Sequence, residues 1–240
     1  MSARATEALF LPAFDGDARL RDEFTSTLAD WSRARHARPT RGIGYPNRTL
    51  GSLEGYWRHV ASQVSADSRP VLIAESFSGL VAARWAASDP RIAGLVLCGA
   101  FARNPAPVAA TLGAWMPAVA HLIGSTLLNP FLAVRPEARR DGWSSALPAA
   151  IRALDRAVVG ERFRLIARED IGADLSALRI PVVLVQFEGD RVIGRAAQRH
   201  LESVCHNARI VRQPGPHFAI ETRPIECARA IAACLAPLFE

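Results

Sequence analysis

The sequence contains no lysine, so all 29 of its basic residues are arginines. Together with 23 acidic residues they give a formal net charge of +6. We attribute the missing lysine to codon usage and give it little functional weight. The arginines form no dense run, and residues 101–180 hold ten of them against seven acidic residues. This distribution is typical of a solvated basic surface and argues against a nucleic-acid groove.

Cysteine is also scarce, and its spacing excludes a common class of metal site. The four cysteines, Cys98, Cys205, Cys227 and Cys234, show neither CxxC spacing nor a neighbouring histidine cluster. A zinc site is therefore not expected, and we predict no metal and no other cofactor. Reduced cysteines within a core or a helix are typical of a cytoplasmic protein, which is the location we predict.

Long apolar runs are missing as well. No stretch approaches the ~18 uninterrupted apolar residues that a membrane-spanning helix requires. The first residues, MSARATEALFLPAF, lack the basic segment followed by a long apolar segment that marks a secretory signal. We therefore expect neither a membrane span nor a secretory signal. At 240 residues, the chain is long enough for one domain with an insertion.

Apolar runs and helical patterns alternate over much of the chain. Strands are predicted at 8–14, 70–76, 92–100, 180–190 and 208–215, with a weaker candidate at 40–47. Helices are predicted at 19–33, 52–64, 79–89, 194–204 and 225–239, from apolar residues at three- and four-residue steps. This alternation predicts an α/β fold with a mostly parallel sheet and helices on both of its faces.

The alternation stops in the middle of the chain. Residues 101–178 contain no convincing strand and are rich in Ala, Leu, Pro and Arg, with short helical patterns. We interpret this block as a mostly helical insertion between two strands of one core. The predicted organisation is thus a core of residues 1–100 and 179–240 with an inserted helical unit at 101–178.

Side chains able to perform catalysis follow several predicted strands. Ser76 is the last residue of the strand at 70–76, Glu188 and Asp190 lie at the end of the strand at 180–190, and His217 follows the last strand. In an open parallel sheet, functional residues gather at the carboxyl ends of the strands. A serine, a carboxylate and a histidine are therefore expected at one edge, in the chain order Ser…Asp…His.

Four local sequences strengthen this interpretation. LIAESFSG resembles a nucleophile elbow, FEGDRVI an acid loop, QPGPHF a histidine loop, and LFLPAFDGD an oxyanion loop. Across nearly its whole length the chain resembles the α/β-hydrolase superfamily, with 101–178 at the usual place of a cap domain. The resemblance implies this fold without the usual leading hairpin, because only about seven residues precede the first strand. It therefore implies a sheet of about six strands.

The resemblance also implies a role for each of these residues. Ser76 would attack the substrate, His217 would carry the proton, and Asp190 would orient His217, because a serine hydroxyl needs a base and the base needs a fixed tautomer. The backbone N–H groups of Phe14 and Phe77 would form the oxyanion hole.

Alternatives exist at two of these positions. Glu188 could replace Asp190 as the carboxylate that orients the histidine. Ser78 is a rival nucleophile, but it would leave Leu80 where the corner needs a small residue, so we interpret Ser78 as a small packing residue. Glu75 is expected to be a buried hydrogen-bonding residue. The elbow carries Ala74 and Ser78 where glycine is common, and we expect such small residues to preserve its geometry.

A serine at the elbow favours ester, thioester or amide hydrolysis through an acyl-enzyme. The overall pattern resembles small carboxylesterases, which include pimeloyl-carrier methyl ester hydrolases. We therefore predict a serine esterase acting on a small or acyl-chain ester. A thioesterase and a non-catalytic ligand-binding protein are the alternatives. Apolar residues of the insertion could line an acyl pocket or pack its helices together: Trp115, Met116, Val119, Leu122 and Phe131. Its arginines could meet an acidic acyl carrier: Arg139, Arg140, Arg152 and Arg156.

Overall fold

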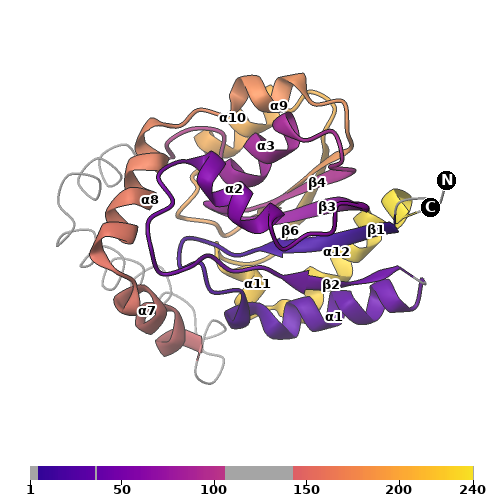
Figure 1. Cartoon of the computed structure of the whole chain (residues 1–240), viewed down its shortest axis with the longest axis horizontal. Helices are drawn as coiled ribbons and strands as arrows, with labels where there is room; N and C mark the ends of the chain where they lie inside the picture. The colour runs from indigo at the N-terminus through magenta and orange to yellow at the C-terminus, as the bar shows by residue number, and fades with distance from the viewer. Residues whose placement is uncertain (1–4, 36, 106–142, 240) are drawn as a thin grey trace.

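The computed structural model of the chain describes residues 5–35, 37–105 and 143–239, and it contains one parallel sheet of six strands (Figure 1). The strand order is β2-β1-β3-β4-β5-β6, and every neighbouring pair is parallel. The predicted fold class and the predicted number of strands are confirmed. The strands are β1 (Ala5–Leu11), β2 (Arg38–Gly42), β3 (Ser68–Glu75), β4 (Gly94–Cys98), β5 (Val182–Phe187) and β6 (Arg209–Gln213).

Helices cover both faces of the sheet (Figure 1). One face packs against α1 (Asp22–Arg33) and α12 (Pro224–Phe239). The other face packs against α2 (Leu53–Ala61), α3 (Ser78–Ser88), α9 (Gly172–Ala177) and α10 (Arg195–Val204). Two short elements sit beside the strand ends, the 3₁₀-helix η1 (Ala18–Arg21) and α11 (Ala219–Thr222). Both faces of the sheet are thus shielded from solvent, as parallel sheets require.

The hydrophobic core is deepest at the central strands. All five residues of β4 are buried, and β3 is buried except for Arg69. Such strands read as continuous apolar runs, which is why the sequence reveals them clearly. The edge strands β2 and β6 are largely exposed or half-buried, with arginines among their few residues.

Element boundaries differ from the predicted ones in a few places. The first strand begins at Ala5 and ends at Leu11, three residues earlier than predicted, because Ala5 already pairs with Ser68 of β3. The predicted helix at 19–33 is divided: η1 comes first, with Asp17 as its cap, and α1 begins at Asp22. The predicted strand at 92–100 is limited to Gly94–Cys98.

Two helices lie beside the end of the sheet at which the parallel strands finish (Figure 1). They are α7 (Trp143–Ala153) and α8 (Arg156–Arg168), and they fall within the predicted insertion between β4 and β5. Residues 106–142 lie outside the described part of the chain. The division into a core and a separate helical cap at 101–178 stays a prediction.

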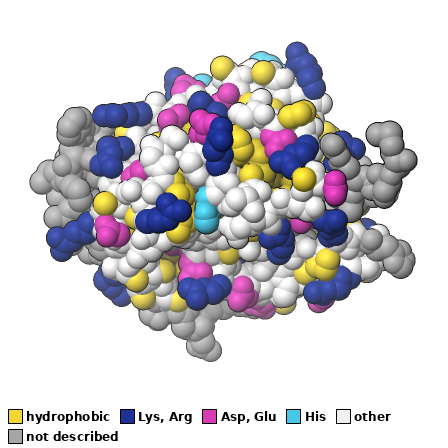
Figure 2. Space-filling view, in the orientation of Figure 1, with side chains coloured by type: hydrophobic (Ala, Val, Ile, Leu, Met, Phe, Trp, Pro, Cys, Tyr) yellow, Lys and Arg dark blue, Asp and Glu magenta, His cyan; other side chains and the backbone are white. Residues whose placement is uncertain are grey.

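The surface carries its positive charge in a dispersed form. On the face seen in Figure 2, arginine side chains are spread out and lie among acidic ones. Surface ion pairs such as Arg58–Glu54 and Arg84–Asp174 accompany this distribution. Among the described residues, no helix combines the length and the apolar character needed to cross a membrane.

Candidate active site

Ser76 occupies a sharp corner between β3 and α3. Its φ is 51°, and it is the one non-glycine residue with positive φ in the described part of the chain. Its N–H donates to the carbonyl of Cys98 at 2.9 Å, and its carbonyl accepts from Gly79 at 2.9 Å. A left-handed conformation costs a non-glycine residue about 1–3 kcal/mol, and such strain clusters at functional sites. The corner predicted from AESFSG is therefore present, with Ser76 at its tip.

Ser78 has a larger role than the packing role expected for it. Its side chain is fully buried, and its Oγ lies 2.6 Å from Tyr45 Oη and also donates to the carbonyl of Pro12. The hydroxyl thus connects the corner, through hydrogen bonds, to the loop that follows β1 and to Tyr45. A hydroxyl engaged in this way is not free to attack a substrate, which leaves Ser76 as the candidate nucleophile.

Gly79 allows α3 to approach the loop after β4. A Cβ at Gly79 would lie 2.6 Å from the Cβ of Ala100, closer than real contacts allow. We predict that Gly79→Ala lowers the free energy of unfolding by about 1–3 kcal/mol, because the helix or the loop must shift. Denaturant unfolding measures this change. Gly194→Ala is the matched control, because no atom lies within 4 Å of its added Cβ. Equal stabilities of the two variants would contradict the tight approach.

His217 links Ser76 to Asp190. Its Nε2 lies 3.0 Å from Ser76 Oγ, and its Nδ1 lies 2.8 Å from Asp190 Oδ2. The other carboxylate oxygen of Asp190 accepts the backbone N–H groups of Val192 and Ile193 at 2.9 and 2.8 Å. His217 is 4% exposed, so the contacts are largely shielded from water. The three residues expected at one edge of the sheet are brought into direct contact.

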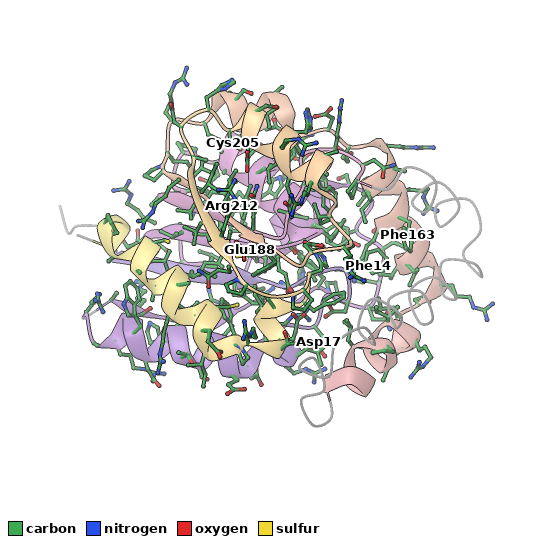
Figure 3. The ribbon with its side chains drawn as sticks, turned by 180° about the vertical axis from the view of Figure 1, so that it is seen from behind. Phe14, Asp17, Phe163, Glu188, Cys205 and Arg212 are labelled. Atoms are coloured by element: carbon green, nitrogen blue, oxygen red, sulfur yellow. The ribbon has the colours of Figure 1, made fainter. Side chains whose placement is uncertain are left out.

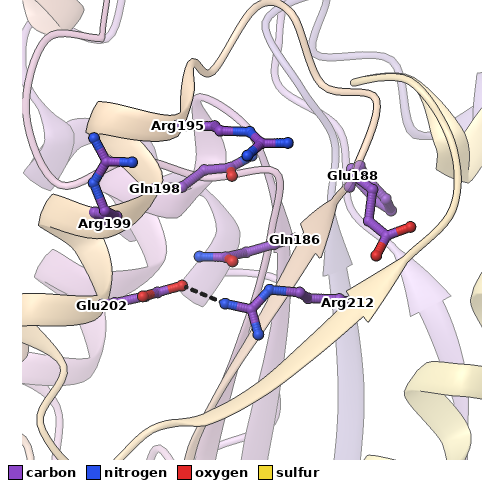
Figure 4. Close-up of a pocket in the computed structure, with 8 residues that line it drawn as sticks. Gln186, Glu188, Arg195, Gln198, Arg199, Glu202 and Arg212 are labelled. Carbon is purple, nitrogen blue, oxygen red and sulfur yellow. Dashed lines mark hydrogen bonds and ion pairs between the residues drawn. The ribbon is translucent and has the colours of Figure 1, made fainter.

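Glu188 does not occupy the position that the alternative assignment requires. It lines a cavity of about 540 Å³ beside α10 and β6, together with Gln186, Arg195 and Arg212 (Figure 4). The contact with the imidazole of His217 is made by Asp190. Of the two carboxylates, it is therefore Asp190 that contacts the histidine.

The two N–H groups expected to form an oxyanion hole lie in well-fixed segments. Phe77 directly follows Ser76 at the start of α3, where the helix dipole adds positive potential. Within the described residues, neither the N–H of Phe77 nor that of Phe14 has a hydrogen-bond acceptor. The first N–H groups of a helix have no partner within that helix, so an unpaired N–H at Phe77 is typical of its position, and the oxyanion hole stays a prediction.

The loop after β1 is held by contacts that the sequence did not reveal. Arg162 of α8 is fully buried; it donates to the carbonyl of Phe14, and its Nε donates to Tyr56 Oη at 3.1 Å. The ring of Phe14 packs against Phe163 of α8 with centroids 4.7 Å apart (Figure 3). One signal could have identified Arg162: it interrupts a buried stripe that contains Val158 and Leu165.

The other predicted residues were not all described by the structure. Trp115, Met116, Val119, Leu122 and Phe131, the expected pocket residues, lie outside the described residues, as do Arg139 and Arg140. Glu75 is buried and hydrogen-bonded, as expected. No group of three or more His, Cys, Asp or Glu side chains suited to a metal is found in the described part of the chain.

The pKa of His217 is raised above its ordinary value. Burial alone would lower it, because an apolar environment disfavours the charged imidazolium. The charge and the hydrogen bond of Asp190, with the charge of Glu75, outweigh that effect, while Arg21 opposes them. The site therefore favours a proton on His217, which suits a base that must accept one.

If His217 acts as a base, the raised pKa predicts the pH dependence. Only the neutral imidazole accepts a proton, so kcat/KM should fall as the pH falls through the pKa of His217. We expect the acid limb of the kcat/KM profile to be centred above about 6.5, the ordinary value for histidine. A profile measured from pH 5 to 9 tests this, and a limb centred below about 6 would contradict it.

The comparison with protein families decides the assignment of the chain. The model of the alpha/beta hydrolase family matches residues 8–230. The chain belongs to the α/β-hydrolase family. None of the curated proteins matches its sequence.

Solved structures show the same α/β-hydrolase fold at low sequence identity. An enol-lactonase from Burkholderia xenovorans has a TM-score of 0.76 and 15% identity, covering 98% of this chain and 91% of that one. An esterase from Rhodococcus sp. has a TM-score of 0.74 and 20% identity, covering 99% and 92%. MenH from S. aureus has a TM-score of 0.77 and 12% identity, covering 100% and 96%. The chain is thus similar to these hydrolase-fold proteins over nearly their full lengths.

Proposed function

We propose that this α/β-hydrolase cleaves a carboxylic ester through an acyl-enzyme, with Ser76 as nucleophile, His217 as base and Asp190 as the orienting carboxylate. One observation carries the proposal. Ser76 sits at a strained corner, with its Oγ 3.0 Å from His217 Nε2, while His217 Nδ1 lies 2.8 Å from Asp190. The esterase and the enol-lactonase among its structural neighbours are consistent with ester chemistry.

The geometry suits two half-reactions. In the first, Ser76 Oγ attacks the ester carbonyl while its proton moves to His217 Nε2, and the tetrahedral oxyanion then expels the alcohol, which takes that proton. In the second, water attacks the acyl-enzyme, His217 accepts a proton from the water, and Ser76 regains it as the acid leaves. The Asp190 carboxylate stabilises the imidazolium formed in both steps.

The oxyanion of each tetrahedral intermediate requires donors that are already in place. The free N–H groups of Phe14 and Phe77 fulfil this requirement in our proposal. Losing one such donor costs about 10²- to 10³-fold in kcat in comparable enzymes. Arg162 supports the arrangement because its bond to the Phe14 carbonyl fixes that peptide segment.

In this proposal, the segment 101–178 is a cap that covers the acyl group of the substrate. α7 already contacts the histidine loop, since Leu147 and Ile151 pack on Phe218. The substrate is a small-molecule or acyl-chain ester in this proposal, and an acidic acyl carrier would be recognised by arginines of the cap such as Arg152 and Arg156. The protein would act in the cytoplasm, without a metal or other cofactor.

A substrate panel tests the proposed function. Esters and thioesters of graded acyl length should be offered to the wild type and to Ser76→Ala, which sets the background rate. We expect ester hydrolysis well above that background. Hydrolysis of thioesters alone would replace the ester assignment with a thioesterase. No hydrolysis above background with any compound would contradict an enzymatic role and favour ligand binding.

A further inference from the structure

One buried arginine is surrounded by three buried carboxylates. The Nη1 of Arg21 donates to Asp15 at 2.7 Å, its Nε donates to Glu75 at 2.9 Å, and its Nη2 pairs with Glu221. All four side chains are 0 or 1% exposed. We call these four residues the Arg21 cluster. A charged group this deeply buried is retained only where it is fully paired.

The three carboxylates belong to three different segments of the candidate site. Asp15 directly follows the first proposed oxyanion donor, and Glu75 directly precedes the proposed nucleophile. Glu221 lies on α11, four residues after the proposed base. A single guanidinium therefore joins three segments of the chain, the loop after β1, the end of β3 and α11, and the proposed chemistry depends on their relative positions.

The charges of the Arg21 cluster do not balance if every group is ionised. Three carboxylates around one guanidinium would leave two negative charges in a site without solvent exposure. Burial raises the pKa of Glu75 well above its ordinary value and also raises that of Glu221, although Arg21 opposes both shifts. In addition, each carboxylate has at least one oxygen buried without a hydrogen-bond donor among the described residues, namely Asp15 Oδ2, Glu75 Oε1 and Glu221 Oε2. The side chains of Glu75 and Glu221 lie within hydrogen-bonding reach of each other. A proton on one glutamate would supply a donor to the other.

We propose that Arg21 is a positioning residue that holds the three segments in register through its carboxylate partners, and that Glu75 and Glu221 share a single proton. The cluster then carries three carboxyl groups, one proton and one guanidinium, so a single net negative charge is left near His217. The positioning role of Arg21 in catalysis rests on the proposed function. The shared proton itself does not depend on substrate turnover.

The other ionisable groups near the two glutamates do not hold the proton that the charge balance of the cluster requires. Cys98 of β4 and Cys227 of α12 both interact with the charge of Glu75, and burial raises the pKa of each thiol, so both stay neutral at working pH. His217 is paired with Asp190. A proton on His217 would be balanced by the charge of Asp190, so we place the proton that the glutamates require within the Arg21 cluster.

Two conservative substitutions test the shared proton. Glutamine keeps the shape of glutamate and cannot ionise, so Glu221→Gln leaves the negative charge on Glu75, and Glu75→Gln moves it to Glu221. The charge of Glu75 raises the pKa of His217. We expect the pKa of His217 to rise in Glu221→Gln and to fall in Glu75→Gln, each by about half a unit or more. NMR titration of the His217 imidazole, assigned with His217→Asn, measures both shifts.

Glu7→Gln is the matched control. Glu7 is also a buried glutamate paired with an arginine, Arg41, but it lies on β1 outside the Arg21 cluster. The pKa of His217 should not change in this variant. Shifts in the same direction, or no shift, in the two cluster variants would overturn the proposal. Unfolding of either glutamine variant would also contradict the proposal. If the two glutamates share one proton, one of them is already neutral, and a neutral glutamine should replace it without loss of the fold.

The NMR measurement separates this inference from the proposed function. It needs no substrate, so opposite pKa shifts would support the Arg21 cluster even if the chain hydrolysed nothing. If the chain is an esterase, the acid limb of its kcat/KM profile should move with the NMR pKa in each variant. Activity without opposite shifts would remove the shared proton and leave the proposed function intact.

Discussion

Replacing Ser76 by alanine should lower kcat for ester hydrolysis by about 10⁶-fold, close to the loss caused by removing all three members of the triad. The reason is that Ser76 Oγ is the atom that would form the acyl bond, and alanine has no atom to replace it. Binding should persist, because the oxyanion donors and the surrounding fold are unchanged. Steady-state kinetics with the best ester of the panel measures the loss.

Ser78→Ala is the matched control for this experiment. Ser78 lies two residues away, is equally small, and also carries a hydroxyl, but that hydroxyl binds Tyr45 and the carbonyl of Pro12. The substitution removes two neutral hydrogen bonds, each worth about 1 kcal/mol of stability, but no reacting atom, so kcat should fall by about tenfold or less. A greater loss in Ser78→Ala than in Ser76→Ala would exchange the two roles and contradict the assignment.

Asp190→Asn should lower kcat by about 10⁴-fold while leaving the fold intact. The asparagine carbonyl oxygen can still accept the N–H groups of Val192 and Ile193. Its NH₂ group would then face His217 Nδ1 and favour the tautomer with the proton on Nε2, which cannot accept the proton of Ser76. The pKa of His217 should also fall, since the charge of Asp190 raises it. Steady-state kinetics measures the loss in kcat, an unfolding curve checks the fold, and NMR titration measures the pKa of His217.

Glu188→Gln provides the comparison for Asp190→Asn. Glu188 lines the cavity beside α10 and β6 rather than contacting the imidazole (Figure 4). A surface substitution away from special contacts changes stability by about 0.5 kcal/mol or less, and kcat should change by about twofold or less. If Glu188→Gln lost more activity than Asp190→Asn, Glu188 would be the orienting carboxylate.

The sequence predicted the elements that bury apolar runs and the residues at their ends. β3 and β4 are buried on both faces, so their apolar composition identifies them without tertiary information. Ser76, Asp190 and His217 follow strands of one parallel sheet, and this topology alone places them at one edge. The sequence favoured Asp190 and left Glu188 as an alternative, because which carboxylate contacts the histidine depends on how the loop after β5 turns.

Features that depend on tertiary contacts were not predictable. Arg21 belongs to a segment with an ordinary amphipathic pattern, and only the folded chain shows that its guanidinium group is buried and paired. The position of Arg162 in an apolar stripe hints at burial, but its partners are visible only in the folded chain. Ser78 was expected to be only a small packing residue. Its hydrogen-bond partners, Pro12 and Tyr45, are distant in the sequence and could not be foreseen. The edge strand β2 has a polar composition and is defined by its pairing with β1.

Labelling with a fluorophosphonate tests the central claim most directly, because this probe phosphonylates a serine that a neighbouring base activates. The wild type, Ser76→Ala and Ser78→Ala should be labelled in the native state, and the modified residue should be mapped by peptide mass spectrometry. We predict label on Ser76 in the wild type and in Ser78→Ala, and none in Ser76→Ala. Labelling of Ser76→Ala equal to the wild type, or no label on any of the three proteins, would contradict Ser76 as an activated nucleophile.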